Sequence, residues 1–256
     1  MPENNENNKT DSEADIQTFY EAPSEQSEIL SAQAPLKGFL IWISLGSIFA
    51  YFVTMSICIL PFIEDPRASK IDTSSLFMAM TLNASLWILA IKYFMPRLTF
   101  PKMVQTSVSD TIKHIITGII YMYAMLVVFN LINYLIQKVL GYTPELQDIA
   151  QRVAQSSTQD LALLILTTVI LVPIVEELLF RGLLYRSLKT KTKPLYAAIL
   201  SAALFALVHG EMRVMPQLFV LGLIFSYFYE KNGSLTVPIT LHCSNNLIGV
   251  TMLIYS

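Results

Sequence analysis

Long apolar runs separated by short polar segments make up most of the chain after residue 36. A helix needs about 20 mostly apolar residues to cross a bilayer, and some of the runs reach that length while others are shorter. The runs cover residues 38–60, 76–95, 115–136, 161–188, 195–209, 214–229 and 235–255. The pattern predicts about seven transmembrane helices. The short fifth and sixth are expected in the core of a bundle, shielded by other helices rather than by lipid.

The composition agrees with a membrane protein. The chain is 54% hydrophobic and only 14% charged, whereas a soluble domain carries roughly 25% charged residues. Cys58 and Cys243 both fall in predicted helices, far apart in sequence, so neither a disulfide framework nor a Cys-x-x-Cys metal site is expected. We therefore predict an all-α fold, a polytopic transmembrane helix bundle.

Residues 1–36 differ from the rest of the chain because they are rich in Asn, Glu and Ser and poor in apolar residues. They include eight acidic residues and one base, Lys9. Such a composition predicts a disordered, acidic N-terminal tail, followed by a helical domain over residues 37–256. The tail lacks an apolar signal-peptide core, so the first hydrophobic segment is expected to act as an uncleaved anchor.

The distribution of basic residues predicts the orientation of the bundle. With the N-terminus inside and seven spans, the inner segments hold 11 Lys and Arg residues and the outer segments hold 5. Because cytoplasmic loops carry the excess of Lys and Arg, we expect a cytoplasmic N-terminus and, for seven spans, an external C-terminus.

Glu176, Glu177 and Arg181 stand in the apolar run 161–188. Ionisable residues at bilayer depth are costly and indicate a functional site. Glu177 and Arg181 are four residues apart on a helix, so they share a face and are expected to form an ion pair. Glu176 lies about 100° away around the helix, without a partner on its own helix. This leaves Glu176 available as a general base.

Two of the three histidines also fall in predicted helices. His209 ends the run Phe205-Ala206-Leu207-Val208-His209, and His242 lies four residues before Asn246, on the same helix face. Each feature alone is weak, because polar residues in membrane helices often serve as interhelical hydrogen-bond partners. Together with Glu176, however, they form a set from three helices that could bind and activate a water molecule.

These motifs, Glu176-Glu177-x-x-x-Arg181, Phe205-x-x-x-His209 and His242-x-x-x-Asn246, resemble the three-motif signature of the CPBP family. That family includes CAAX prenyl endopeptidases and bacteriocin-processing or immunity proteins, and is also called Abi. The resemblance covers about residues 160–250, and every motif position is filled. It implies an intramembrane endopeptidase, a multi-pass protein of a bacterial cell membrane, that acts on a hydrophobic or lipidated peptide in contact with lipid and not on nucleic acid.

The resemblance also implies roles for the motif residues. Glu176 would be the general base, His209 would assist it, His242 and Asn246 would form the oxyanion site, and Glu177 and Arg181 would brace the first motif. Whether a metal takes part stays open, because His209 and His242 could bind zinc. Catalytic zinc typically has three protein ligands, and Glu176 as the third would be less free to act as a base. We favour water activated by glutamate, with Zn²⁺ as the alternative.

Two other functional classes compete with the protease. A non-catalytic bacteriocin self-immunity or membrane scaffold protein could use the same bundle to bind a partner. Transport is disfavoured, because the ionisable residues gather in three helices and do not line a path through the bundle. The sequence does not predict the substrate, the cleavage site or the oligomeric state.

Overall fold

The computed structural model describes residues 34–59, 73–94, 106–141 and 157–255, and every regular element within them is helical. The elements are α3 (Ala34–Ile59), α4 (Thr73–Phe94), α5 (Val108–Leu140), α7 (Thr158–Leu164), η3 (Ile165–Leu171), α8 (Val172–Glu177), η4 (Leu178–Tyr185), α9 (Arg186–Lys189), α10 (Pro194–Val208), α11 (Met215–Asn232) and α12 (Thr236–Tyr255). Each predicted apolar run coincides with one helix, counting α7 to α9 as one continuous helix. The all-α prediction is therefore confirmed.

The helices differ in whether they are long enough to span a membrane. Within the described residues, four helical segments are long and apolar enough to cross a bilayer: Gly38–Ile57, Val108–Val139, Thr158–Lys189 and Thr236–Tyr255. The apolar parts of α4 and α10 are shorter. Length and composition thus support between four and seven crossings. The predicted tail lies outside the described residues up to residue 33, and α3 begins at Ala34, before the expected boundary at residue 37.

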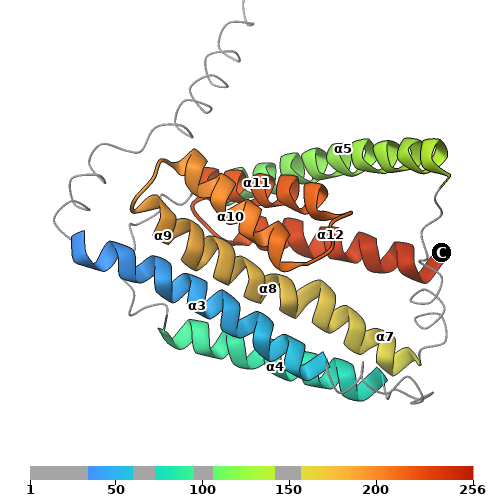
Figure 1. The fold of residues 1–256 in the computed structure, drawn as a ribbon, viewed down its shortest axis with the longest axis horizontal. Helices are drawn as coiled ribbons and strands as arrows, with labels where there is room; N and C mark the ends of the chain where they lie inside the picture. The colour runs from blue at the N-terminus through green and yellow to red at the C-terminus, as the bar shows by residue number, and fades with distance from the viewer. Residues whose placement is uncertain (1–33, 60–72, 95–105, 142–156, 256) are drawn as a thin grey trace, which may run out of the picture.

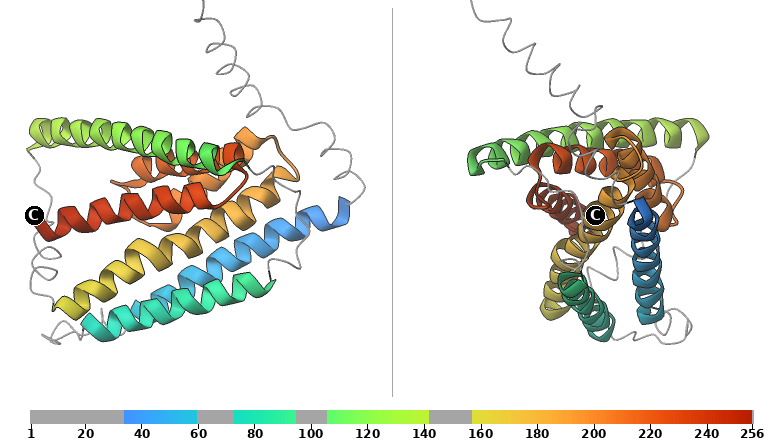
Figure 2. Two further views of the ribbon diagram at one scale, coloured as in Figure 1. Left: turned by 180° about the vertical axis from the view of Figure 1, so that it is seen from behind. Right: turned by 90° about the vertical axis from the view of Figure 1, so that its left-hand side faces the viewer.

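The helix from α7 to α9 is the central element of the bundle. It packs against α3 and α4 on one side and against α10 and α12 on the other. Helix α5 lies at the far edge, in contact with α11 and α12 (Figures 1 and 2). Half of the most apolar stretch of the central helix is buried, against 11% for α5. Helix α5 is therefore the least buried of the four long apolar helices, so lipid must cover most of its surface. The central helix is the most buried of the four and can position a buried site.

Two π-helical segments, η3 and η4, flank the α-helical segment α8 in the central helix. The spacing of the apolar and charged residues predicts a regular α-helix here, and the two π-helical segments correct that prediction. The physical cause in η3 is Pro173, whose nitrogen has no hydrogen to donate. Just before it, the Val172 N–H donates to the Thr167 carbonyl, five residues back. Wide turns of this kind occur frequently at functional sites.

Close contact between α10 and α11 depends on small residues. A Cβ atom built on Gly222 would lie 2.8 Å from the Cβ and 2.9 Å from the Cα of Ala202. Small residues let membrane helices approach closely, and here they bring the backbone of α11 within reach of the central helix. At the end of α11, Gly233 adopts a left-handed conformation (φ 71°), which ends the helix and lets α12 begin.

Candidate active site

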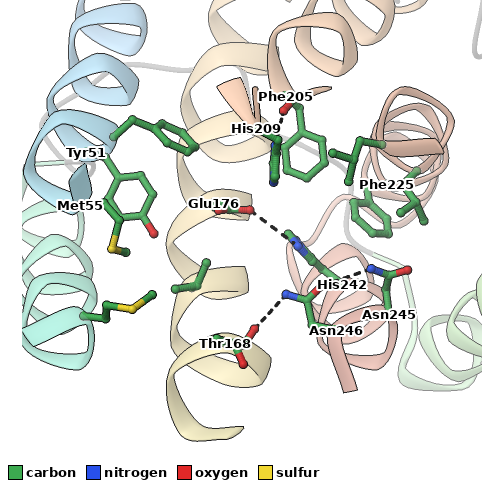
Figure 3. Close-up of a pocket in the computed structure, with 15 residues that line it drawn as sticks. Tyr51, Met55, Thr168, Glu176, Phe205, His209, Phe225, His242, Asn245 and Asn246 are labelled. Atoms are coloured by element: carbon green, nitrogen blue, oxygen red, sulfur yellow. Dashed lines mark hydrogen bonds and ion pairs between the residues drawn. The ribbon is translucent and has the colours of Figure 1, made fainter. Parts of the chain in front are cut away.

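A cavity of about 340 Å³ lies where α3, α4, the central helix, α10, α11 and α12 meet. Most of its wall is apolar, and its polar groups come mainly from the central helix, α10 and α12 (Figure 3). The four predicted catalytic residues all line it. The lining residues are Tyr51, Phe52, Met55, Met80, Thr168, Val172, Glu176, Phe205, His209, Leu218, Leu221, Phe225, His242, Asn245 and Asn246.

The two adjacent glutamates have different surroundings, as the helical geometry predicts. Glu176 lines the cavity and is 4% exposed, whereas Glu177 is fully buried outside the lining. The Glu177 carboxylate accepts a hydrogen bond of 2.8 Å from Arg181 Nη1. The predicted i,i+4 ion pair is therefore present, and Glu176 is the carboxylate that remains available to a molecule in the cavity.

Arg181 connects three helices although its side chain is completely buried. Its Nη2 donates to the Gly222 carbonyl of α11 at 3.0 Å. Its guanidinium lies 4.8 Å from the ring centre of Phe205 and 5.2 Å from that of Phe225. Aromatic faces and a carboxylate together offset the cost of burying a cation. The expected brace of the first motif thus extends to α10 and α11.

His242 lies between the two glutamates. Its Nδ1 is 2.9 Å from Glu177 Oε1, and its Nε2 is 3.7 Å from Glu176 Oε2. The first contact is a hydrogen bond; the second is too long for one but short enough for a single bridging water. The ring stacks on Phe225, with centres 5.2 Å apart. Because an ionised Glu177 only accepts, it places a proton on Nδ1 and directs Nε2 to the cavity.

The contact between Glu177 and His242 was not predicted from the sequence. From the sequence, Glu177 is expected to pair with Arg181 alone, and His242 shares a helix face with Asn246. Both pairings follow from spacing along one helix, whereas the contact between Glu177 and His242 joins residues 65 positions apart. Spacing along one helix does not predict which residue of another helix a side chain will contact.

His209 occupies the C-terminal end of α10. Its Nδ1 lies 2.6 Å from the Phe205 carbonyl oxygen, which can only accept, so Nδ1 carries the proton and the lone pair of Nε2 is free. The ring points into the cavity above Glu176 (Figure 3). Gly210 follows with φ 70°, a conformation that glycine adopts readily and that turns the chain out of α10 directly after the imidazole.

Asn246 contacts the π-helical turn of the central helix. Its Nδ2 donates to the Thr168 carbonyl at 2.8 Å. That carbonyl has no ordinary helical donor: Val172 N–H is directed to Thr167, and the next residue is Pro173. Asn246 therefore satisfies a backbone group that the π-helical turn leaves open. One N–H of its amide is used in this way, and only the other is left for the predicted oxyanion role.

The cavity residues do not form a ready zinc site. Both imidazoles have Nε2 available, which is the right kind of donor, and Glu176 could be a third. Among the described residues, however, no three His, Cys, Asp or Glu side chains gather closely enough to hold a metal ion. Catalytic zinc typically has three protein ligands. The donor set as it lies does not fit zinc.

The sequence analysis missed the wall that α3 and α4 contribute, from Tyr51, Phe52, Met55 and Met80. Aromatic residues and methionines are ordinary in membrane helices, so their presence at 38–60 and 76–95 carried no signal. Only the packing of α3 and α4 against the central helix places them at the cavity.

Comparison with known proteins bears on this region. Residues 158–248 match the family described as type II CAAX prenyl endopeptidase Rce1-like, a group within the CPBP proteins. This match contains Glu176, His209, His242 and Asn246. Residues 158–248 form a CPBP domain. The CPBP domain thus comprises the central helix, α10, α11 and most of α12, whereas α3, α4 and α5 lie outside it.

Three curated relatives are similar to the chain over part of its length. The "Putative membrane peptidase YdiL" of Bacillus subtilis is 30% identical over 94 residues, 37% of this chain and 38% of the relative. An "Uncharacterized 24.3 kDa protein" of Escherichia coli is 34% identical over 103 residues, 38% of this chain and 47% of the relative. The "Membrane-embedded CAAX protease MroQ" of Staphylococcus aureus is 25% identical over 159 residues, 57% of this chain and 61% of the relative.

The alignments therefore span between 38% and 61% of the length of these relatives. No solved structure matches the chain. Residues 158–248 thus match a CPBP-type family, and helices long and apolar enough to cross a membrane surround that region.

Proposed function

We propose that this protein is an intramembrane endopeptidase that hydrolyses a peptide bond with a water molecule activated by Glu176. The observation that carries the proposal is the convergence of a carboxylate and two imidazoles, from three separate helices, in one largely apolar cavity. Burying Glu176 and His242 together is costly, and water activation is the chemistry that this set suits. The relatives described as a membrane peptidase and a CAAX protease support the same reading.

The proposed reaction begins with a water on the cavity side of Glu176 and His242 that hydrogen-bonds to both residues, whose facing atoms are 3.7 Å apart. Glu176 takes a proton from the water, and the water oxygen bonds to the carbonyl carbon of the substrate. The carbonyl oxygen gains the electron pair and becomes an oxyanion. As the C–N bond breaks, Glu176 returns the proton to the leaving nitrogen. The oxyanion returns its electron pair to form the carbonyl again, so the direct products are a carboxylic acid and an amine. The acid then passes its proton to the amine, which gives a carboxylate and an ammonium group, and no step involves a metal.

Two groups in the cavity are suited to stabilise the oxyanion. Asn246 has one N–H left beside the one bonded to Thr168. His242 can donate from Nε2 only when both ring nitrogens carry protons, and Glu177 at 2.9 Å places a negative charge beside that cation. His209, at the mouth of the cavity, has Nε2 free to exchange a proton with the attacking water or the leaving amine.

The walls of the cavity indicate the substrate class. Apart from the catalytic groups, they are built largely from aromatic, leucine and methionine side chains, for example Phe52, Leu218 and Phe225. Lipid surrounds the bundle, so a hydrophobic or lipidated peptide can approach from the membrane. Processing of a CAAX-type chain or of a peptide precursor fits this chemistry. We place the protein in a bacterial cell membrane with its N-terminus in the cytoplasm.

The direct test compares the peptides in membranes of cells that produce the wild-type protein or the Glu176→Gln variant. We expect cleavage products that are present with the wild type and lost with Glu176→Gln and His209→Ala. Glu211→Gln is the matched control, because it makes the same change on an exposed side chain of the loop after α10. It should keep the products.

Identical peptides from wild-type and Glu176→Gln membranes, with equal amounts of folded protein, would refute the protease. If a cellular phenotype such as bacteriocin immunity then survived in the Glu176→Gln strain, the non-catalytic immunity or scaffold function would replace it.

A further inference from the structure

Tyr51 of α3 is a buried polar residue at the cavity that neither the motifs nor the family match includes. It is 1% exposed and lines the cavity together with Glu176. Its hydroxyl oxygen has no hydrogen-bond partner among the described residues. The residue lies outside the CPBP domain, which begins at residue 158.

The unpartnered hydroxyl is unusual because buried polar groups are nearly always hydrogen-bonded. Leaving a buried donor unbonded costs about 1–3 kcal/mol. Glu177, Arg181 and Asn232 also contain buried atoms without a partner, but each has another side-chain atom that is bonded. The hydroxyl is the whole polar part of the Tyr51 side chain, so the entire group lacks a partner in the described part of the chain.

The ring of Tyr51 is held in position by neighbouring aromatic residues. Its centre is 5.9 Å from that of Trp87 and 5.2 Å from that of Phe52, both with edge-to-face geometry. Trp87 is fixed in turn by a hydrogen bond of 3.0 Å from Nε1 to Thr54. The hydroxyl therefore has a defined direction, and Figure 3 shows it on the wall across Glu176 from His242 and Asn246.

We infer that the Tyr51 hydroxyl binds the substrate by donating a hydrogen bond to a backbone carbonyl oxygen of the peptide. The inference rests on the proposed function. A peptide that enters the apolar cavity brings carbonyl groups that need donors. Tyr51 is a donor on the α3 wall that has no acceptor among the residues the structure describes. Met55 and Met80 line the same side, and their flexible side chains let this wall adjust to a peptide.

The experiment uses Tyr51→Phe, which removes the hydroxyl and keeps the ring that packs against Trp87. The substrate is the peptide whose cleavage distinguishes wild-type from Glu176→Gln membranes, made synthetically and added to the full chain in liposomes. We expect kcat/KM to fall about threefold to tenfold, the effect of one neutral hydrogen bond. Tyr196→Phe, the same change at an exposed site, should leave kcat/KM unchanged.

Thermal stability provides the readout that separates substrate binding from a structural role. Removing an unbonded buried hydroxyl is neutral or stabilising, so Tyr51→Phe should unfold in detergent at the wild-type temperature or above. We also expect the peptide to bind Glu176→Gln more tightly than Tyr51→Phe/Glu176→Gln, in a background where no turnover occurs.

Two results would overturn the inference while leaving the proposed function intact. One is a kcat/KM of Tyr51→Phe within experimental error of the wild type. The other is a loss of activity that is matched by a lower unfolding temperature and by unchanged peptide affinity in the Glu176→Gln background. If no peptide distinguishes wild-type from Glu176→Gln membranes, the proposed function fails and this inference fails with it.

Discussion

Glu177 is the residue on which the geometry of the site depends most. Its Oε1 accepts from both Arg181 at 2.8 Å and His242 at 2.9 Å. The two bonds join the central helix to α12 and set which nitrogen of His242 carries a proton. Glu177 therefore does more than form an ion pair with Arg181, because it also orients His242, which faces Glu176.

Glu177→Gln should reduce activity far more than it reduces folded yield. The amide keeps the volume but loses the charge, and its NH₂ group can take the place of the acceptor that faces His242. In serine proteases, replacing the carboxylate that orients the histidine costs roughly 10⁴-fold in kcat, so we expect a loss between tenfold and that value. Cleavage rates in liposomes measure it.

Glu230→Gln is the control for this change. Glu230 is a partly buried glutamate that forms an ion pair with Lys189 at 2.6 Å, and it is not among the residues that line the cavity. Activity of Glu177→Gln equal to that of Glu230→Gln would show that Glu177 has no orienting role.

At the scale of elements, the π-helical turn before Pro173 is what connects the central helix to Asn246. The turn leaves the Thr168 carbonyl without a helical donor, and Asn246 bonds it at 2.8 Å. A regular α-helix through this region would close the carbonyl within the helix and rotate the residues before Glu176 relative to α12.

Pro173→Ala should therefore lower activity without lowering stability, because it restores an N–H that can compete for the freed carbonyls. A double-mutant cycle with Asn246→Ala measures the link, and we expect a coupling of about 0.5–3 kcal/mol, as for residues in direct contact. Pro194→Ala is the control, since Pro194 stands in the first turn of α10, where no helical bond is missing. Purely additive effects of Pro173→Ala and Asn246→Ala would contradict this account.

The packing of α10 on α11 is a second feature of element scale. Gly222 is the point of closest approach, and its carbonyl accepts a hydrogen bond from Arg181 at 3.0 Å. Gly222→Ala would place a methyl group against the Ala202 backbone, which cannot move aside as a side chain can. We expect a loss of about 1–3 kcal/mol, the usual cost of overpacking, and a lower unfolding temperature in detergent.

Gly249→Ala in α12 is the matched control, because a Cβ atom added to Gly249 would have no neighbour within 4 Å among the described residues. Alanine has the higher helix propensity, so this variant should be at least as stable as the wild type. Equal stability of both alanine variants would exclude tight α10–α11 packing.

At the scale of the whole molecule, three described lysines from different helices lie at one end of the bundle. Helix α3 begins there, and α4, α9 and α11 end there (Figure 1). Lys92, Lys189 and Lys231 lie in the last turns of those three helices. The alternation of helix directions thus brings together charges that are far apart in sequence.

We expect this basic end to face the cytoplasm. The test starts from a protein in which Cys58 and Cys243 are replaced by serine or alanine. Single cysteines are then introduced at Lys191, beside α9, or at Tyr255, at the end of α12, and intact cells are treated with a membrane-impermeant maleimide. Labelling at position 255 and protection at position 191 would support the orientation. The reverse pattern would invert it.

The sequence by itself determined the helical fold, the membrane environment and the four motif residues that line the cavity, Glu176, His209, His242 and Asn246. An apolar run of bilayer length forms a helix because its backbone N–H and C=O groups must bond to each other in lipid. Charged residues inside such a run are easily recognised in the sequence. The i,i+4 spacing also predicted the contact of Glu177 with Arg181, because both residues belong to one helix. Each of these conclusions depends on information that is local in the chain.

Only the tertiary structure decided which groups face each other. It placed His242 on Glu177, Asn246 on the Thr168 carbonyl and the Tyr51 ring at the cavity, each by packing one helix against another. It also contained π-helical turns, where the angle per residue assumed from a regular α-helix does not hold. Contacts between distant segments depend on how side-chain shapes fit together between helices. Spacing along one helix does not predict that fit.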